Sequence, residues 1–264
     1  MLKKFHFFHI LDNSPWPLLI SFNGLNSMTS FLLFLTTHNL YSKLLSIFNM
    51  IMLLTCATLW WRDVLRESYL QGHHTYKVMS IMKMGMALFI ISEIMLFSSF
   101  FWSYFYSCLA PEPEVGMIWP PNGILPLNPF EIPLLNTLIL LGSGATVTWS
   151  HFAFITSNYK TSFMTLKLTI ALGMIFTILQ YMEYNMSLFN INDSVYSSLF
   201  YMITGLHGTH VIIGAMFMLF NLYRMYFSQM NLNHHFSLEA SIWYWHFVDI
   251  IWLYLYTFMY WWHF

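Results

Sequence analysis

The chain has 264 residues, of which 58% are hydrophobic, 20% are aromatic and only 8% are charged. A soluble globule of this length needs more polar surface than this composition supplies, so the sequence is typical of a membrane protein. The net charge of -1 at pH 7 and the lack of Lys or Arg clusters longer than two residues argue against a nucleic-acid partner. Two cysteines, Cys56 and Cys108, are too few and too scattered for a disulfide framework or a zinc site.

Several segments reach the roughly 20 apolar residues that a helix needs to cross a bilayer. The first of them is the weakest, since Asn23 and Asn26 interrupt it, whereas the prolines precede or border the segments or fill the loop between the third and the fourth. We therefore predict an all-α, polytopic membrane bundle of seven transmembrane helices, at approximately 16–35, 43–61, 79–107, 133–155, 163–183, 196–223 and 237–262.

The distribution of charge predicts the orientation, because short loops rich in Lys and Arg stay on the side from which insertion occurs. With the N-terminus inside, Lys43 is the only one of the ten Lys and Arg residues on the outer side. The predicted outer loops carry acidic residues instead, namely Glu112, Glu114, Glu131, Glu183 and Asp193. This bias also supports seven spans.

The stretch WWRDVLRESYLQGHHT follows the second span on the inner side, and we expect its helix to continue to about Gly72. Arg62 and Arg66 are four residues apart, as are Asp63 and Glu67, and each like-charge pair costs an isolated helix about 0.2–0.5 kcal/mol. The sequence therefore predicts partners outside the chain that neutralise both charged stripes.

Two interpretations of this stretch stay open. Trp60 and Trp61 lie at the depth where indoles prefer the headgroup layer, and arginines can hold a lipid phosphate in a bidentate manner. The alternative is a solvated juxtamembrane turn that only follows the preference for positive charge on the inner side.

Five ionisable residues fall near the middle of predicted spans, where such groups are expensive and often functional. They permit three interpretations: hydrogen bonds between helices, a proton relay through the carboxyl, or ligation of haem or copper by imidazole. No Cys, Met or carboxylate motif accompanies the histidines, which disfavours the metal. The five are Glu93, His207, His210, His246 and Asp249.

No motif of a soluble enzyme is present in the sequence: there is neither a phosphate-binding glycine loop nor a nucleophile elbow. The adjacent pairs His73–His74 and His234–His235 point in different helical directions, so chelation by either pair alone is not expected. We therefore expect no metal site in this chain.

The stretch WWRDVLRESYLQGHHT is followed along the chain by FIISEIMLFSSFFW, APEPEVGMIWPPNGILPLNPFEIPLLNT, GLHGTHVIIG and WYWHFVDIIWLYLY. In their order and spacing these five motifs resemble those of the cytochrome c oxidase subunit III family. The match extends from about Asp12 to Trp262, and the chain looks like a mitochondrially encoded member. It differs in its first helix and at WSHF, where many relatives have two adjacent histidines, which argues against an essential role for a histidine pair there.

The resemblance implies a bundle split into a two-helix unit, residues 1–77, and a five-helix unit, residues 78–264, around a V-shaped cleft filled with phospholipid. It implies a chain without haem or copper, which bind only in partner subunits. The expected partners are oxidase subunits I and II and smaller accessory subunits. The expected location is the mitochondrial inner membrane, with the N-terminus in the matrix and the C-terminus in the intermembrane space.

The family's function would be to support proton uptake and to protect the catalytic subunit during electron transfer from cytochrome c to oxygen. Glu93 matches the family's buried, carbodiimide-reactive carboxyl. Matching positions imply lipid-headgroup contacts, to which the geometry of the charged stretch adds Arg62: Trp61, Arg66, Glu67, His74 and Arg224.

Two further classes of protein are consistent with the polar residues alone, a proton-coupled transporter with a Glu/His relay and a haem-binding membrane protein. Transporters commonly show internal repeats and interrupted helices, and this sequence shows neither.

Overall fold

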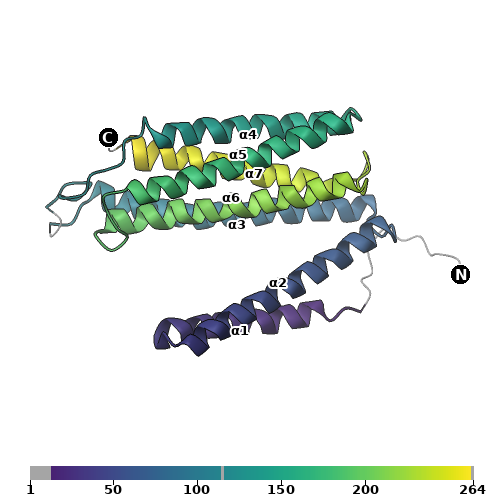
Figure 1. Ribbon diagram of the computed structural model, residues 1–264, viewed down its shortest axis with the longest axis horizontal. Helices are drawn as coiled ribbons and strands as arrows, with labels where there is room; N and C mark the ends of the chain where they lie inside the picture. The colour runs from purple at the N-terminus through teal and green to yellow at the C-terminus, as the bar shows by residue number, and fades with distance from the viewer. Residues whose placement is uncertain (1–12, 114–115, 263–264) are drawn as a thin grey trace, which may run out of the picture. The chain divides into compact units, whose positions relative to one another are not determined.

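The computed structural model describes residues 13–113 and 116–262, which form seven α-helices and a short π-helix and include no strand. The prediction of an all-α, polytopic helical bundle is confirmed. The α-helices are α1 (Trp16–Thr37), α2 (Leu40–Tyr69), α3 (Tyr76–Leu109), α4 (Ile132–Ile155), α5 (Tyr159–Met186), α6 (Val195–Tyr226) and α7 (Phe236–Leu255), and η2 (Tyr256–Trp261) continues α7 (Figure 1).

Six of these helices, α1 to α6, are long and apolar enough to cross a membrane. The last helix, α7, is shorter and carries Glu239, His246 and Asp249 among its apolar residues. Its crossing of the membrane therefore stays a prediction. The helices also extend a few residues past most of the predicted spans, because a helix does not need apolar residues once it has left the hydrocarbon.

The chain divides into two compact units, Met1–Met82 and Lys83–Phe264, and the boundary falls within α3. In the first unit α1 and α2 pack side by side. Asn23 donates to the Cys56 sulfur at 3.2 Å, and the Asn49 side chain donates to the Asn26 carbonyl at 3.2 Å. Asn23, which weakens the first span in the sequence, therefore holds it to the second helix, whereas Asn26 takes part only through its backbone carbonyl.

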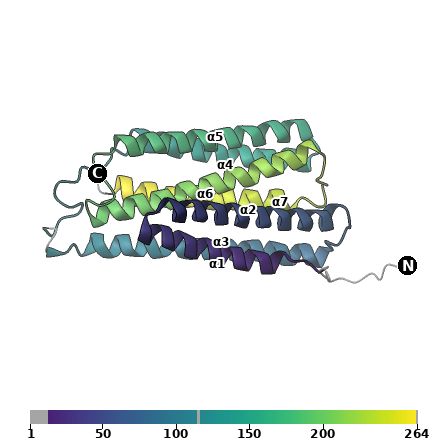
Figure 2. The same cartoon turned by 60° about the horizontal axis from the view of Figure 1, so that its bottom comes forward.

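The second unit contains a closed ring of four helices, in which α4 contacts α5, α5 contacts α6, α6 contacts α7 and α7 contacts α4 (Figures 1 and 2). The helix α3 packs on α6 and α7 through large aromatic side chains. The ring centroid of Phe97 lies 5.1 Å from that of His210 on α6 and 6.0 Å from that of Phe247 on α7.

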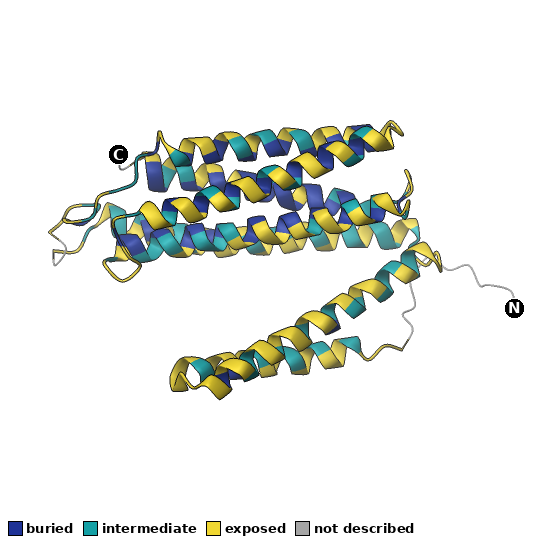
Figure 3. Ribbon diagram, in the orientation of Figure 1, coloured by how far each residue is buried: buried dark blue, intermediate teal, exposed yellow. Residues whose placement is uncertain are grey.

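Burial differs between the two units. Buried side chains line the helices of the ring, whereas α1 and α2 are mostly exposed and apolar (Figure 3). An apolar exposed surface of this extent suits lipid or partner subunits rather than water.

Trp245 of α7 packs closely against the three other helices of the ring. Its side chain is fully buried, and its indole nitrogen donates to the Ser143 hydroxyl of α4 at 2.8 Å. A methyl group at Gly173 of α5 would lie 2.7 Å from the indole, and one at Gly214 of α6 would lie 3.0 Å from it. The two glycines let α5 and α6 approach α7, as small residues commonly do between membrane helices.

We predict that Gly173→Ala destabilises the second unit, because the new methyl group has no room beside Trp245. Over-packing costs about 1–3 kcal/mol, which exceeds the gain of about 1 kcal/mol in helix propensity. The measurement is the midpoint of thermal unfolding of the purified protein. Gly142→Ala is the control, since nothing lies within 4 Å of a methyl group there; equal midpoints for the two variants would contradict the prediction.

Candidate functional site

The charged end of α2 is organised around Asp63. The indole nitrogen of Trp16 donates to Asp63 at 2.7 Å, and the carboxylate also pairs with Arg62 at 3.0 Å and more distantly with Arg66 at 3.9 Å. The prediction that both charged stripes need partners outside the chain is therefore wrong for Asp63. Helix α1 returns Trp16 to the carboxylate, and the arginines lie one and three residues away on α2.

The arginine side chains remain open to solvent or lipid, with 46% of Arg62 and 57% of Arg66 exposed. Trp61 beside them is 67% exposed. Two guanidinium groups share the single carboxylate of Asp63, so the cluster can still accept an anion. Glu67 and His74 lie nearby in sequence and have contacts of their own, and their roles stay predictions.

Glu93 and His210 form an acid and histidine pair between α3 and α6. The carboxylate oxygen lies 2.8 Å from Nε2 of His210, and Nδ1 of the same ring lies 2.7 Å from the Leu206 carbonyl. A carbonyl oxygen can only accept, so Nδ1 carries a hydrogen. The proton between Nε2 and Glu93 therefore belongs either to a neutral acid facing a neutral imidazole or to an ion pair.

The other intramembrane residues do not join this pair. Nε2 of His207 donates to the Val248 carbonyl of α7 at 3.1 Å, while His246 and Asp249 lie 3.6 Å apart on α7 itself. The predicted polar network is thus three separate contacts rather than one continuous path. Asp249 also lies against Gly144 of α4, where a methyl group would approach its carboxylate to 2.6 Å.

Arg224, the last predicted lipid contact, is only 5% exposed and fixes the loop between α6 and α7. One guanidinium nitrogen donates to the Ser237 hydroxyl and another to the Gln229 carbonyl at 3.3 Å. In the same loop, burial lowers the pKa of His234, and the charge of Arg224 adds to this effect. Both acceptors of Arg224 are neutral, and its Nε is buried without a hydrogen-bond partner among the described residues. A lipid contact by Arg224 stays a prediction.

Glu183 lies in α5 and not in a loop. The prediction of an outer loop is wrong, because α5 continues to Met186 and buries the carboxyl to 2% exposure. Tyr260 donates to it at 2.6 Å and Gln180 at 3.3 Å. The signal in the sequence was the spacing of Gln180 and Glu183, which places both on one face of an apolar helix.

His151, His235 and Glu239 form a cluster of side chains. The sequence did not predict it. Only the pair His235 and Glu239, four residues apart, has a signal in the sequence. His151 comes from a different helix, and its approach depends on the tertiary fold.

The fold and these contacts define a polytopic helical membrane protein whose acid and histidine side chains pair between helices. The family model described as cytochrome c oxidase subunit III matches residues 6–264. The chain belongs to the cytochrome c oxidase subunit III family. It is therefore a subunit of that oxidase, in the context of the mitochondrial respiratory chain, as the resemblance implies.

Curated relatives match over nearly the whole chain. Cytochrome c oxidase subunit 3 of Pelomedusa subrufa is 50% identical over 99% of this chain and 99% of its own length. The protein of the same name from Rhipicephalus sanguineus is 47% identical over 98% of this chain and 99% of its own length. That of Myxine glutinosa is 46% identical over 99% of both chains.

We predict that the pair of Glu93 and His210 stabilises the packing of α3 on α6. Glu93→Leu leaves His210 without its side-chain partner and should cost about 1–3 kcal/mol, whereas Glu93→Gln keeps a hydrogen-bonding group and should cost less. The measurement is the thermal midpoint of the purified oxidase.

The double variant Glu93→Leu/His210→Leu should lose less stability than the two single variants together, since the contact can be lost only once. If the losses of stability in the two single variants summed to that of the double variant, the pairing of Glu93 with His210 would be contradicted. Because the pair ends at a backbone carbonyl, we expect Glu93→Gln to leave proton pumping unchanged, and a loss of pumping would assign the carboxyl to a relay.

Proposed function

We propose that this chain is a non-redox core subunit of the oxidase, which stabilises the catalytic subunit during electron transfer from cytochrome c to oxygen and supports proton uptake. One observation carries this proposal: His210 of α6 uses both ring nitrogens within the chain, on Leu206 and Glu93. A haem ligand needs a free imidazole nitrogen, which His210 therefore lacks. His207 donates from Nε2 to the Val248 carbonyl of α7, and its remaining nitrogen, Nδ1, is buried in a ring against which Phe176 and Trp252 pack, so both residues suit packing better than ligation.

Phospholipid binding is the second part of the proposal. The support is the cluster of Arg62 and Arg66 at the end of α2, where Trp61 is exposed beside them. Guanidinium groups bind phosphate through charge-assisted, bidentate hydrogen bonds. Asp63 fixes the geometry of the cluster, so the arginines are positioned before a headgroup arrives.

The orientation of the chain belongs to this proposal as well. Excess positive charge supports a matrix location for the N-terminus and for the loop after α2, and therefore a C-terminus in the intermembrane space. Subunits I and II and smaller accessory subunits would cover part of the apolar surface, and phospholipid the remainder.

We predict that Arg66→Ala reduces the phospholipid retained per purified oxidase and shortens the active lifetime of the enzyme during turnover. Loss of one charge-assisted hydrogen bond costs about 1.5–3 kcal/mol, a factor of roughly 10 to 100 in lipid affinity. The initial rate of electron transfer should stay near that of the wild type, because the chain carries no redox centre in this proposal.

Lys43→Ala is the matched control, since it removes a cation from the opposite end of the same helix. If Arg66→Ala retained as much phospholipid as the wild type, residues 60–75 would be better interpreted as a solvated turn. An immediate loss of electron transfer in the same variant would contradict the non-redox assignment.

A further inference from the structure

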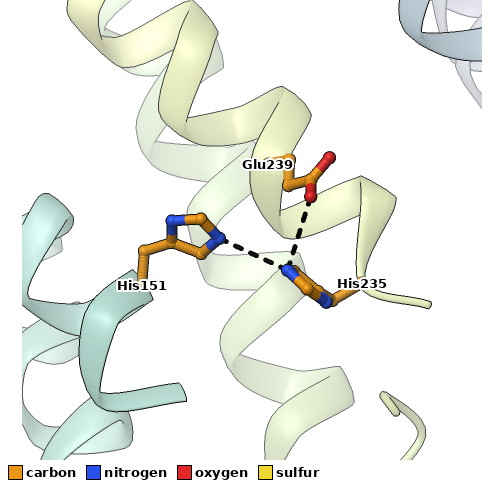
Figure 4. A group of neighbouring side chains, drawn as sticks. All are labelled: His151, His235 and Glu239. Atoms are coloured by element: carbon orange, nitrogen blue, oxygen red, sulfur yellow. Dashed lines mark hydrogen bonds and ion pairs between the residues drawn. The ribbon is translucent and has the colours of Figure 1, made fainter. Parts of the chain in front are cut away.

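Three side chains meet where α4 ends and α7 begins, at the end of the second unit that also holds the loop between α6 and α7 (Figure 4). His151 lies in the last turns of α4, His235 occupies the position just before α7, and Glu239 lies in the first turn of α7. The side chains of His235 and Glu239 are only 11% and 20% exposed. None of these residues has a part in the contacts described above.

The ligand atoms of the cluster converge on a small volume. Nε2 of His151 lies 3.3 Å from Nε2 of His235, which in turn lies 3.4 Å from Oε1 of Glu239. All three atoms lie within 4.8 Å of one another. Ligands about 2.0–2.1 Å from a tetrahedral zinc ion stand about 3.3–3.4 Å from each other, so two edges of the cluster already have this length.

Hydrogen bonds cannot satisfy this arrangement while both rings are neutral. Nε2 of His235 carries either one hydrogen or one lone pair, yet it faces a carboxylate and a second imidazole nitrogen at once. If Nε2 carries a hydrogen, it can donate a good hydrogen bond to only one of the two neighbours. If it carries a lone pair, the carboxylate repels that lone pair. Nδ1 of His235 is buried without a hydrogen-bond partner among the described residues, so the rest of the chain does not fix the tautomer.

We propose that His151, His235 and Glu239 form a site for a borderline divalent cation of the zinc class. A cation at the centre would accept one lone pair from each of the three side chains and so remove the conflict at His235. Two imidazoles and one carboxylate are a common set for zinc, and water would complete the tetrahedron. Magnesium and calcium prefer oxygen ligands and fit this set poorly.

Lys83 of α3 sets the affinity of the site. Its ammonium group lies 2.6 Å from Oε2 of Glu239, the carboxylate oxygen that does not face His235. The positive charge of this ammonium group opposes a cation bound by the same carboxylate. The site is therefore weaker than the same ligands would be without the lysine. Zinc has no redox chemistry, so this site is compatible with a non-redox subunit.

The test is equilibrium dialysis of the purified oxidase against radioactive zinc, after prior treatment with a chelator. Wild-type oxidase should bind at least one zinc equivalent more than His235→Gln, and Glu239→Gln should raise the dissociation constant of that equivalent at least tenfold. Excess magnesium should not displace it. The optical spectrum and subunit composition of each variant show that the complex is assembled.

Lys83→Met should strengthen zinc binding, whereas the ligand variants weaken it. A misfolded variant would not bind zinc more tightly. Lys83→Met removes the competing charge and should tighten the same zinc equivalent severalfold. His73→Gln, at an exposed histidine outside the cluster, is the matched control and should bind as the wild type does. Equal zinc binding by wild type and His235→Gln, or weaker binding by Lys83→Met, would overturn the proposal and leave the cluster as a contact within the protein.

Discussion

The contact of Trp245 with its neighbours on three other helices is the constraint on which the second unit depends. The indole fills the space left by Gly173 and Gly214 and donates its only hydrogen to Ser143. In a membrane the apolar surfaces of helices gain little from contact with each other, so close packing and buried hydrogen bonds must hold the bundle together. Trp245 supplies both kinds of interaction at one position, which fixes α7 against α4, α5 and α6.

Polar side chains elsewhere in the second unit also join helices through hydrogen bonds. Glu93 on α3 reaches His210 on α6, His207 on α6 reaches the backbone of α7, and Tyr260 beyond α7 reaches Glu183 on α5. Each contact crosses between elements, and each would be costly to break in hydrocarbon. This distribution explains how a chain can hold several acids and histidines in membrane helices and still serve as a structural subunit.

The helices and the family could be predicted from the sequence, because the length of an apolar run and the order of five motifs are local properties. The partners of polar residues could not be predicted, because they depend on which helices become neighbours. Asn23 illustrates this, since a residue that weakens the first span joins α1 to Cys56 of α2. The approach of His151 to His235 had no local signal, and Glu183 was misplaced because a charge near a span end was taken as the end of the helix.

The central claim is that this chain contributes packing and positioning to the oxidase and no redox centre. The most direct measurement is the iron and copper content of the oxidase before and after the chain is removed with detergent, together with the content of the separated chain. We expect the depleted complex to keep all of its iron and copper and the separated chain to show no haem absorption. Loss of one equivalent of either metal with the chain, or a haem spectrum in the separated fraction, would contradict the account.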